Sequence, residues 1–126
     1  MQFINSLNEL NLPWKYKKFL EYFLVNLAKI ENIERVILFG SCARGTVHKR
    51  SDVDLLIIGD GITDDEEDYI YSDCGPEYPS SYYSACDIFT STYGRYNEMK
   101  TEVGSLQWRI ERDGKDLTAV MNGILT

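Results

Sequence analysis

The sequence predicts a single α/β domain in which apolar strands pack against amphipathic helices. Its 126 residues are enough for one compact core and too few for two ordinary domains. With 44% hydrophobic and 26% charged residues, the composition is typical of a globular chain. Apolar residues occur both in short unbroken runs and at spacings of three and four. We therefore expect residues 1–126 to form one domain without an internal repeat or linker.

The first predicted element is a helix that begins near Pro13. Proline suits a first helical turn because the N–H that it lacks would have no partner there. Apolar residues then recur at spacings of three and four, which is the pattern of a helix lying on a core. These residues are Tyr16, Phe19, Leu20, Phe23, Leu24 and Leu27.

Two apolar runs, Val36 to Phe39 and Val53 to Ile58, predict strands. Because the first run is apolar at every position, we expect that strand to be covered on both faces. A third strand is predicted over Tyr83 to Ser91, which is rich in β-branched and aromatic residues. Alternation puts Asp87 on one face of it, among small and apolar residues. A charge at such a position needs a partner.

The segment between the second and third predicted strands is acidic and rich in tyrosine. It sustains no period, so we predict a long surface loop over residues 60–82 with a short helical turn around Asp65 to Tyr71. Its carboxylate run, Asp64 to Glu67, could bind a metal ion or a basic surface, although such runs are usually a solvated face.

After the third strand, one helix is predicted from Tyr93 to Arg112. Gly104 lies inside it and weakens the pattern, and Asp113-Gly114 would end it. Residues 115–126 could form a final strand or a turn. The buried stripe of the helix would consist of Tyr96, Met99, Val103, Leu106 and Ile110.

Charge and cysteine content exclude several classes of protein. A formal charge of -7 argues against a protein whose main task is to grip nucleic acid, since that needs a basic patch. No apolar run approaches the length of a membrane span, and the N-terminus lacks the pattern of a signal peptide. Cys42, Cys74 and Cys86 fit no zinc spacing and no disulfide framework. We expect a cytoplasmic protein with free thiols and no direct contact with nucleic acid or membrane.

Gly40, Ser41 and Arg44 form a candidate phosphate-binding turn after the first predicted strand. Glycine lets the backbone approach a ligand, and the N–H groups of the short helical segment that follows would point at an anion. The Ser41 hydroxyl adds a donor, and Arg44 offers a bidentate fork. His48, in the polar connection that follows, could act as a base or contact substrate, but it fits a solvated loop residue better.

Asp52 and Asp54 open the second apolar run. Residues two apart in a strand point to the same side, and their Cα atoms lie about 6 to 7 Å apart. Two like charges on a buried sheet must bind a proton or share a cation, and a divalent metal such as Mg²⁺ resolves the conflict. If Asp87 joins them from a neighbouring strand, the site could hold two ions or accept a proton from an attacking hydroxyl. This arrangement indicates phosphoryl or nucleotidyl transfer.

The pattern GSCARG followed by SDVDL resembles the minimal nucleotidyltransferases of the DNA polymerase β superfamily. The resemblance covers residues 34–89 well and the flanking helices loosely. The residues that match are Gly40, Ser41, Ala43, Arg44, Gly45, Ser51, Asp52, Asp54 and Leu55.

This resemblance implies a small mixed sheet flanked by helices and a nucleoside triphosphate held at Gly40 and Ser41. It also implies Mg²⁺ at Asp52 and Asp54, with Asp87 as the third carboxylate. Asp73 is the rival for that third position, although its Ser-Asp-Cys-Gly context is typical of a turn.

The resemblance further implies a partner, because stand-alone domains of this kind often pair with a helical HEPN protein as antitoxin and toxin. The expected activity is transfer of AMP from ATP to a hydroxyl, such as a tyrosine, of the HEPN toxin. Two alternatives stay open. One is transfer to a small cationic molecule such as an aminoglycoside, attracted by the acidic residues 64–68, and the other is a non-catalytic antitoxin that neutralises its partner by binding.

Overall fold

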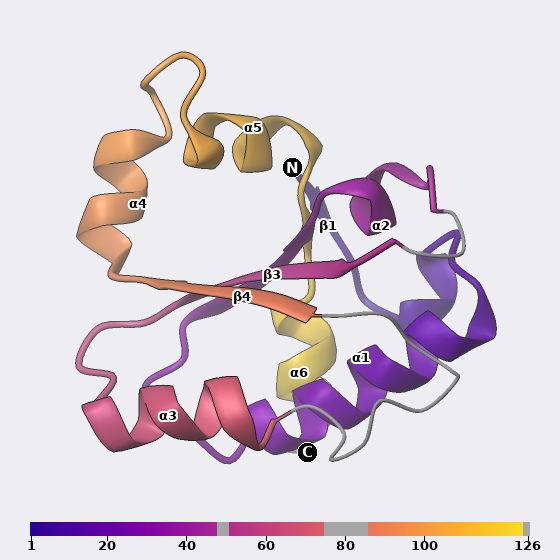
Figure 1. The fold of residues 1–126 in the computed structure, drawn as a ribbon, viewed down its shortest axis with the longest axis horizontal. Helices are drawn as coiled ribbons and strands as arrows, with labels where there is room; N and C mark the ends of the chain where they lie inside the picture. Colours follow the sequence, from indigo (N-terminus) through magenta and orange to yellow (C-terminus); the bar gives the residue numbers. More distant parts are fainter. Residues whose placement is uncertain (48–50, 75–85, 125–126) are drawn as a thin grey trace.

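A five-stranded mixed sheet runs through the part of the chain that the structure describes, residues 1–47, 51–74 and 86–124 of a computed structural model (Figure 1). Strand β2 is antiparallel to both of its neighbours, β5 and β3, whereas β1 is parallel to β5 and β3 is parallel to β4. The predicted small mixed sheet with flanking helices is confirmed. In spatial order the strands are β1 (Gln2–Phe3), β5 (Lys115–Asp116), β2 (Arg35–Phe39), β3 (Val53–Ile58) and β4 (Cys86–Ser91).

One face of the sheet is covered by α1 (Trp14–Leu27), α3 (Asp64–Ser72) and α6 (Thr118–Ile124), which lie below the sheet in Figure 1. The side chains of Val36 and Leu38 on β2 are buried in this larger core. All six apolar residues of the stripe predicted for α1 are buried too. The spacing of apolar residues therefore identified both this helix and its buried face.

The opposite face is covered by α4 (Tyr93–Met99) and α5 (Leu106–Asp113), above the sheet in Figure 1. Ile37 of β2 packs in this smaller core with Tyr96 and Ile110. Because consecutive residues of β2 enter two different cores, the strand is apolar at every buried position. The prediction of a strand covered on both faces is confirmed for β2, and the buried residues of β3 alternate between the two cores in the same way.

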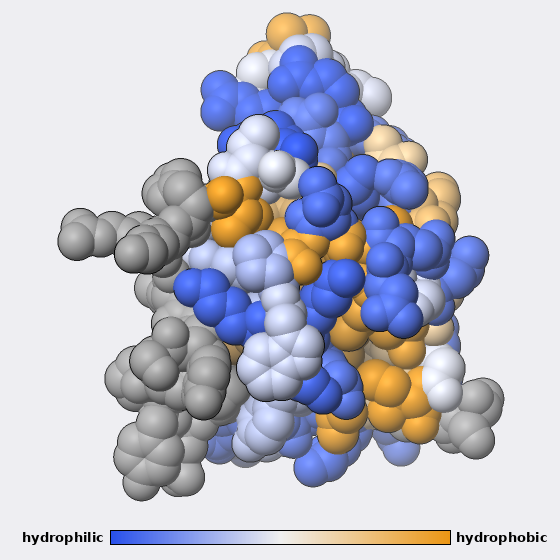
Figure 2. Space-filling model, turned by 90° about the vertical axis from the view of Figure 1, so that its right-hand side faces the viewer, coloured by the Kyte–Doolittle hydropathy of each residue, from blue (hydrophilic) through white to orange (hydrophobic). Residues whose placement is uncertain are grey.

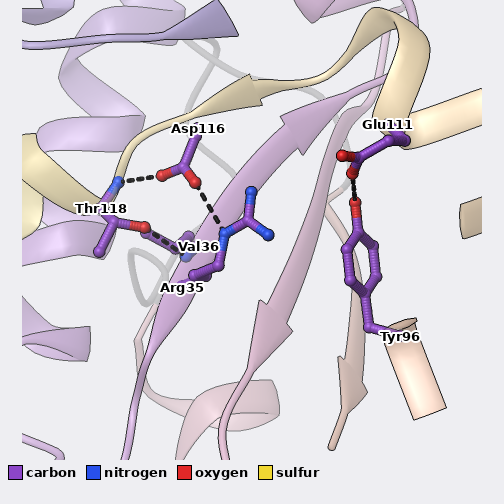
Figure 3. A network of polar contacts seen from close by, with 6 residues as sticks. All are labelled: Arg35, Val36, Tyr96, Glu111, Asp116 and Thr118. Carbon is purple, nitrogen blue, oxygen red and sulfur yellow. Dashed lines mark hydrogen bonds and ion pairs between the residues drawn. The ribbon is translucent and has the colours of Figure 1, made fainter. Parts of the chain in front are cut away.

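Buried polar contacts fix the C-terminal segment to the sheet (Figure 3). Asp116, only 3% exposed, accepts hydrogen bonds from Arg35 Nε at 2.9 Å and from the backbone N–H of Thr118 at 2.8 Å. The backbone N–H of Val36 donates to Thr118 Oγ1 at 3.1 Å. The buried carboxylate is therefore paired, as a charge removed from water must be.

Two helices replace the single helix predicted over residues 93–112. Helix α4 ends at Met99, and the turn that follows contains Gly104, whose φ of 89° does not fit a right-handed helix. Ser105 then starts α5, its side chain accepting a hydrogen bond from the backbone of the first turn. Val103, predicted to lie in the buried stripe, is 84% exposed as a result.

Three other segments are more regular than predicted. Within the expected loop, α3 forms a full helix that begins with a capping box between Thr63 and Glu66. After α5, the short strand β5 precedes the helix α6, whereas the sequence suggested a strand or turn alone. A 3-10 turn, η1 (Leu7–Glu9), and the short strand β1 carry too few residues to show a period.

Four predictions fall partly or wholly outside the described residues. They concern His48, residues 75–82 of the expected loop, the first part of the third strand, residues 83–85, and residues 125–126 of the final segment. Among the helices that the structure does describe, none is long and apolar enough to cross a membrane.

Candidate active site

The turn after β2 brings Gly40 against the side chain of Asp54. Gly40 has φ 73° and ψ -156°, a conformation open essentially to glycine alone, and the short helix α2 (Ser41–Arg44) follows it. A Cβ atom on Gly40 would lie 2.2 Å from Asp54 Oδ2. Glycine is therefore required here by both the backbone and the neighbouring carboxylate.

Asp54 lies next to Asp87 because β3 and β4 are parallel and in register at this pair. The pKa of Asp54 is raised to about 6. Burial is the largest cause, followed by the negative charges of Asp87 and Asp52, whereas the Arg44 guanidinium opposes the shift. This environment favours a proton on Asp54 when no cation is present.

Asp52 and Ser41 belong to the two segments that adjoin Asp54. Asp52 precedes β3 and is half-buried, its charge acts on Asp54, and its backbone oxygen accepts a hydrogen bond from Cys42 Sγ at 3.3 Å. Ser41 opens α2 directly after Gly40 and is also half-buried. The other predicted site residues, Gly40, Arg44 and Asp87, lie against Asp54 or act on its charge, at the point where β2 ends and β3 begins.

The carboxylates suit a divalent cation that binds together with its substrate. In the part of the chain that the structure describes, they do not form a ready set of three metal ligands. Mg²⁺ commonly uses only one or two protein carboxylates and completes its shell with water and substrate phosphates. The adjoining pair Asp54 and Asp87 matches that donor set, because a shared cation would replace the proton on Asp54.

Asp73 does not join these residues. It is exposed at the C-terminal end of α3, where its backbone N–H bonds to the Tyr69 oxygen at 2.8 Å. Helix α3 packs on the larger core, whereas alternation along β3 directs Asp54 to the face that α4 and α5 cover. The acidic run that begins at Asp64 lies in the first turn of α3 and is equally remote from that face.

A cleft of about 470 Å³ opens beside Gly40, between α2 and α5. Gly40 and Arg44 line it on one side, and Arg109 and Arg112 line it on the other. Figure 2 shows this end of the molecule, with hydrophilic side chains over most of its upper part and larger hydrophobic areas below. The two α5 arginines were not among the residues predicted for the site. Their spacing of three along a predicted helix can be seen in the sequence. The sequence does not show which element that helix faces.

Comparisons with known proteins give the class of this chain. Residues 16–111 match the family model of the nucleotidyltransferase domain, so the chain belongs to the nucleotidyltransferase domain family. Among solved structures, it is similar to the crystal structure of a proposed nucleotidyltransferase from Sulfolobus solfataricus, with 20% identity and a TM-score of 0.43. That similarity covers 67% of this chain and 78% of the other. No curated protein matches the sequence.

Membership of this family establishes the general activity, which is nucleotidyl transfer, and implies a nucleoside triphosphate as substrate. Domains of this family generally use divalent metal ions.

Proposed function

We propose that this nucleotidyltransferase transfers AMP from ATP to a hydroxyl group of a protein partner, and that Asp52, Asp54 and Asp87 hold Mg²⁺ for this reaction. The observation that carries the proposal is the pairing of Asp54 with Asp87 directly beside Gly40. Two acidic groups side by side on adjacent strands oppose folding unless a cation or a proton is bound. Their position next to an open glycine turn suits a metal-bound phosphate.

Gly40, Ser41 and Arg44 are proposed to hold the phosphates. The missing side chain at Gly40 leaves the backbone free for close approach, and Ser41 adds a hydroxyl donor. Arg44 is exposed, and its charge acts on Asp54. A phosphate that Arg44 binds would therefore lie close to the carboxylates.

The proposed step is an in-line displacement at the α-phosphorus. The acceptor oxygen forms a bond to this phosphorus, the bond from phosphorus to the bridging β-oxygen breaks, and pyrophosphate leaves with that electron pair. Asp87 takes the proton of the attacking hydroxyl, which is the role of the third carboxylate. Bound divalent ions, up to two, would stabilise the entering and leaving oxygens.

The proposed acceptor is a tyrosine of a HEPN-type toxin, which makes the chain an antitoxin. This rests on the sequence resemblance and on a formal charge of -7, which suits a basic partner. Phe89, 43% exposed, follows Asp87 by two residues on the same side of β4, and its ring lies 5.9 Å from that of Phe39. This aromatic pair would suit an incoming tyrosine ring.

A small cationic acceptor finds less support. The acidic residues expected to attract it, 64–68, belong to α3, on the opposite side of the sheet from α4 and α5. Neutralisation by binding alone remains a separate alternative, which the test below distinguishes.

The test is intact mass spectrometry of the partner encoded next to this chain, after incubation with ATP, Mg²⁺ and purified protein. We expect the partner's mass to rise by whole adenylate units with the wild type and with Asp73→Asn, and to stay unchanged with Asp54→Asn. An unmodified partner in the wild-type reaction contradicts the proposal. If the double variant Asp52→Asn, Asp54→Asn still neutralises the toxin, binding rather than transfer is the mechanism.

A further inference from the structure

The cleft between α2 and α5 concentrates positive charge on an acidic protein. Arg44, Arg109 and Arg112 line it, and Asp113 is the acidic residue in its described lining. A second hollow of about 400 Å³, also lined by Arg44 and Arg112, continues it towards Lys115. With a formal charge of -7 on the whole chain, three guanidinium groups against one carboxylate make this cleft a local exception.

Helix α5 is held firmly in position at this cleft. Ile110, 1% exposed, packs in the smaller core, and Tyr96 donates a hydrogen bond to the Glu111 carboxylate (Figure 3). The amino group of Met1 donates to the backbone oxygen of Glu111 at 2.6 Å. At the end of the helix, a Cβ atom on Gly114 would lie 2.9 Å from Ile37 Cγ2, which leaves no gap to β2. The arginines of α5 therefore start from a fixed helix, which lowers the entropy lost when they bind an anion.

The arginines differ in how far they are already occupied. Arg112 lies over the Trp108 ring at 4.8 Å and forms an ion pair with Asp113 at 3.3 Å. Neither Arg44 nor Arg109 forms an ion pair with any residue that the structure describes. Both are exposed, and they stand on opposite walls of the cleft. Two available guanidinium groups that face one space suit a ligand with several anionic oxygens.

Gly40 joins this cleft to the carboxylates. It lines the cleft, and it also touches Asp54. A phosphate chain lying in the cleft would therefore have one end at the Asp54–Asp87 pair and its other phosphates between Arg44 and Arg109.

We propose that Arg109 on α5 is a further binding residue for the β- and γ-phosphates of the donor nucleotide, and for the pyrophosphate that leaves, across the cleft from Gly40 and Arg44, with Arg112 as a weaker contact. The catalytic meaning of this site rests on the function proposed above. Its ligand chemistry, an oligophosphate, does not. The assignment accounts for a triphosphate donor, because a nucleoside monophosphate would leave the α5 arginines without a ligand.

The test is calorimetric binding of inorganic pyrophosphate and of AMP to the full chain in EDTA. We expect Arg109→Gln to weaken pyrophosphate binding about five- to ten-fold, the loss of one charge-assisted contact at an exposed site, and to leave AMP binding unchanged. Asp113→Asn should tighten pyrophosphate binding about two-fold, since it removes the opposing charge. Arg95→Gln is the matched control, because Arg95 is an exposed arginine that lines a different hollow, beside Gly59 and Thr90.

Equal pyrophosphate affinity in wild type and Arg109→Gln overturns the inference, as does an equal loss in Arg95→Gln or no binding by the wild type. Thermal melting of each variant checks that the fold is intact. Failure of the proposed function is separable from these outcomes. A chain that adenylylates no partner, yet binds pyrophosphate through Arg109, contradicts the function and supports the cleft assignment.

Discussion

Asp54 on β3 and Asp87 on β4 are register partners across two parallel strands, and the negative charge of Asp87 helps to raise the pKa of Asp54. The two residues are separated by a whole helix in the sequence, so their proximity depends on how β3 and β4 pair. That pairing makes them the centre of the candidate site and sets the predictions below.

Asp87→Asn is expected to lower kcat for adenylyl transfer by about 100-fold or more, the typical contribution of a positioned general base. Asp73→Asn should change it by less than about two-fold, because Asp73 is exposed at the end of α3 and the variant is a surface substitution. Single-turnover transfer rates measured for both variants check this. A large loss in Asp73→Asn with none in Asp87→Asn would exchange the two assignments.

Asp54→Asn is expected to stabilise the metal-free fold at neutral pH. The pKa of Asp54 is raised from 3.8 to about 6, so the folded state holds its proton more tightly than the unfolded state. The contribution of Asp54 to the free energy of unfolding is therefore present below about pH 4 and is lost as the pH rises towards 6 and above. Asparagine carries no charge and avoids this loss.

Thermal unfolding in EDTA measures the effect. The melting temperature of Asp54→Asn should exceed that of the wild type at pH 7.5, and the difference should shrink as the pH falls below 5. A variant less stable than wild type at pH 7.5 would mean that the neighbours of Asp54 stabilise its ionised carboxylate more than they destabilise it.

Gly40→Ala should be more damaging than Gly45→Ala. Gly45 (φ 72°, ψ 19°) is in the left-handed helical region, where an alanine costs about 1–2 kcal/mol of backbone strain. Gly40 (φ 73°, ψ -156°) is in a region open essentially to glycine, where the strain reaches up to about 3 kcal/mol. At Gly40 the new methyl group would also collide with Asp54, whereas at Gly45 the nearest atom is Asn11 Nδ2 at 3.8 Å. Chemical denaturation and transfer assays should show a larger loss of stability and of activity at Gly40.

The control for that comparison is the double variant Gly40→Ala, Asp54→Ala, which removes the collision. It should recover part of the stability lost in Gly40→Ala alone, without any recovery of transfer. If the double variant loses the sum of both single effects, the two residues are not in contact.

Ile110→Ala is expected to cost about 2–4 kcal/mol of unfolding free energy, because it empties a site in the smaller core. Val103→Ala should cost less than about 0.5 kcal/mol, as expected of an exposed position. Urea unfolding of both variants checks this, with Ile110 at 1% and Val103 at 84% exposure. Similar losses would instead favour one continuous helix over residues 93–112.

Much of the local structure could be predicted from the sequence. The stripe of α1, the two apolar strands and the Gly-Ser turn all depend on contacts within a few residues, so their patterns identify them. The residues predicted to bind phosphate and metal ions, which are Gly40, Ser41, Arg44, Asp52 and Asp54, all belong to one short stretch of the sequence. Their catalytic roles stay predictions.

Only the tertiary structure decided which distant elements meet. Asp87 was a conditional candidate until the parallel register set it beside Asp54, because strand pairing depends on contacts between segments far apart in the chain. The turn that contains Gly104 separates α5 from α4, and α5 then places Arg109 at the cleft beside Gly40. Periodicity gives the buried face of a helix but not the element that covers it, so the sequence determined the Asp52–Asp54 side of the site, and the packing of β4 and α5 decided the rest.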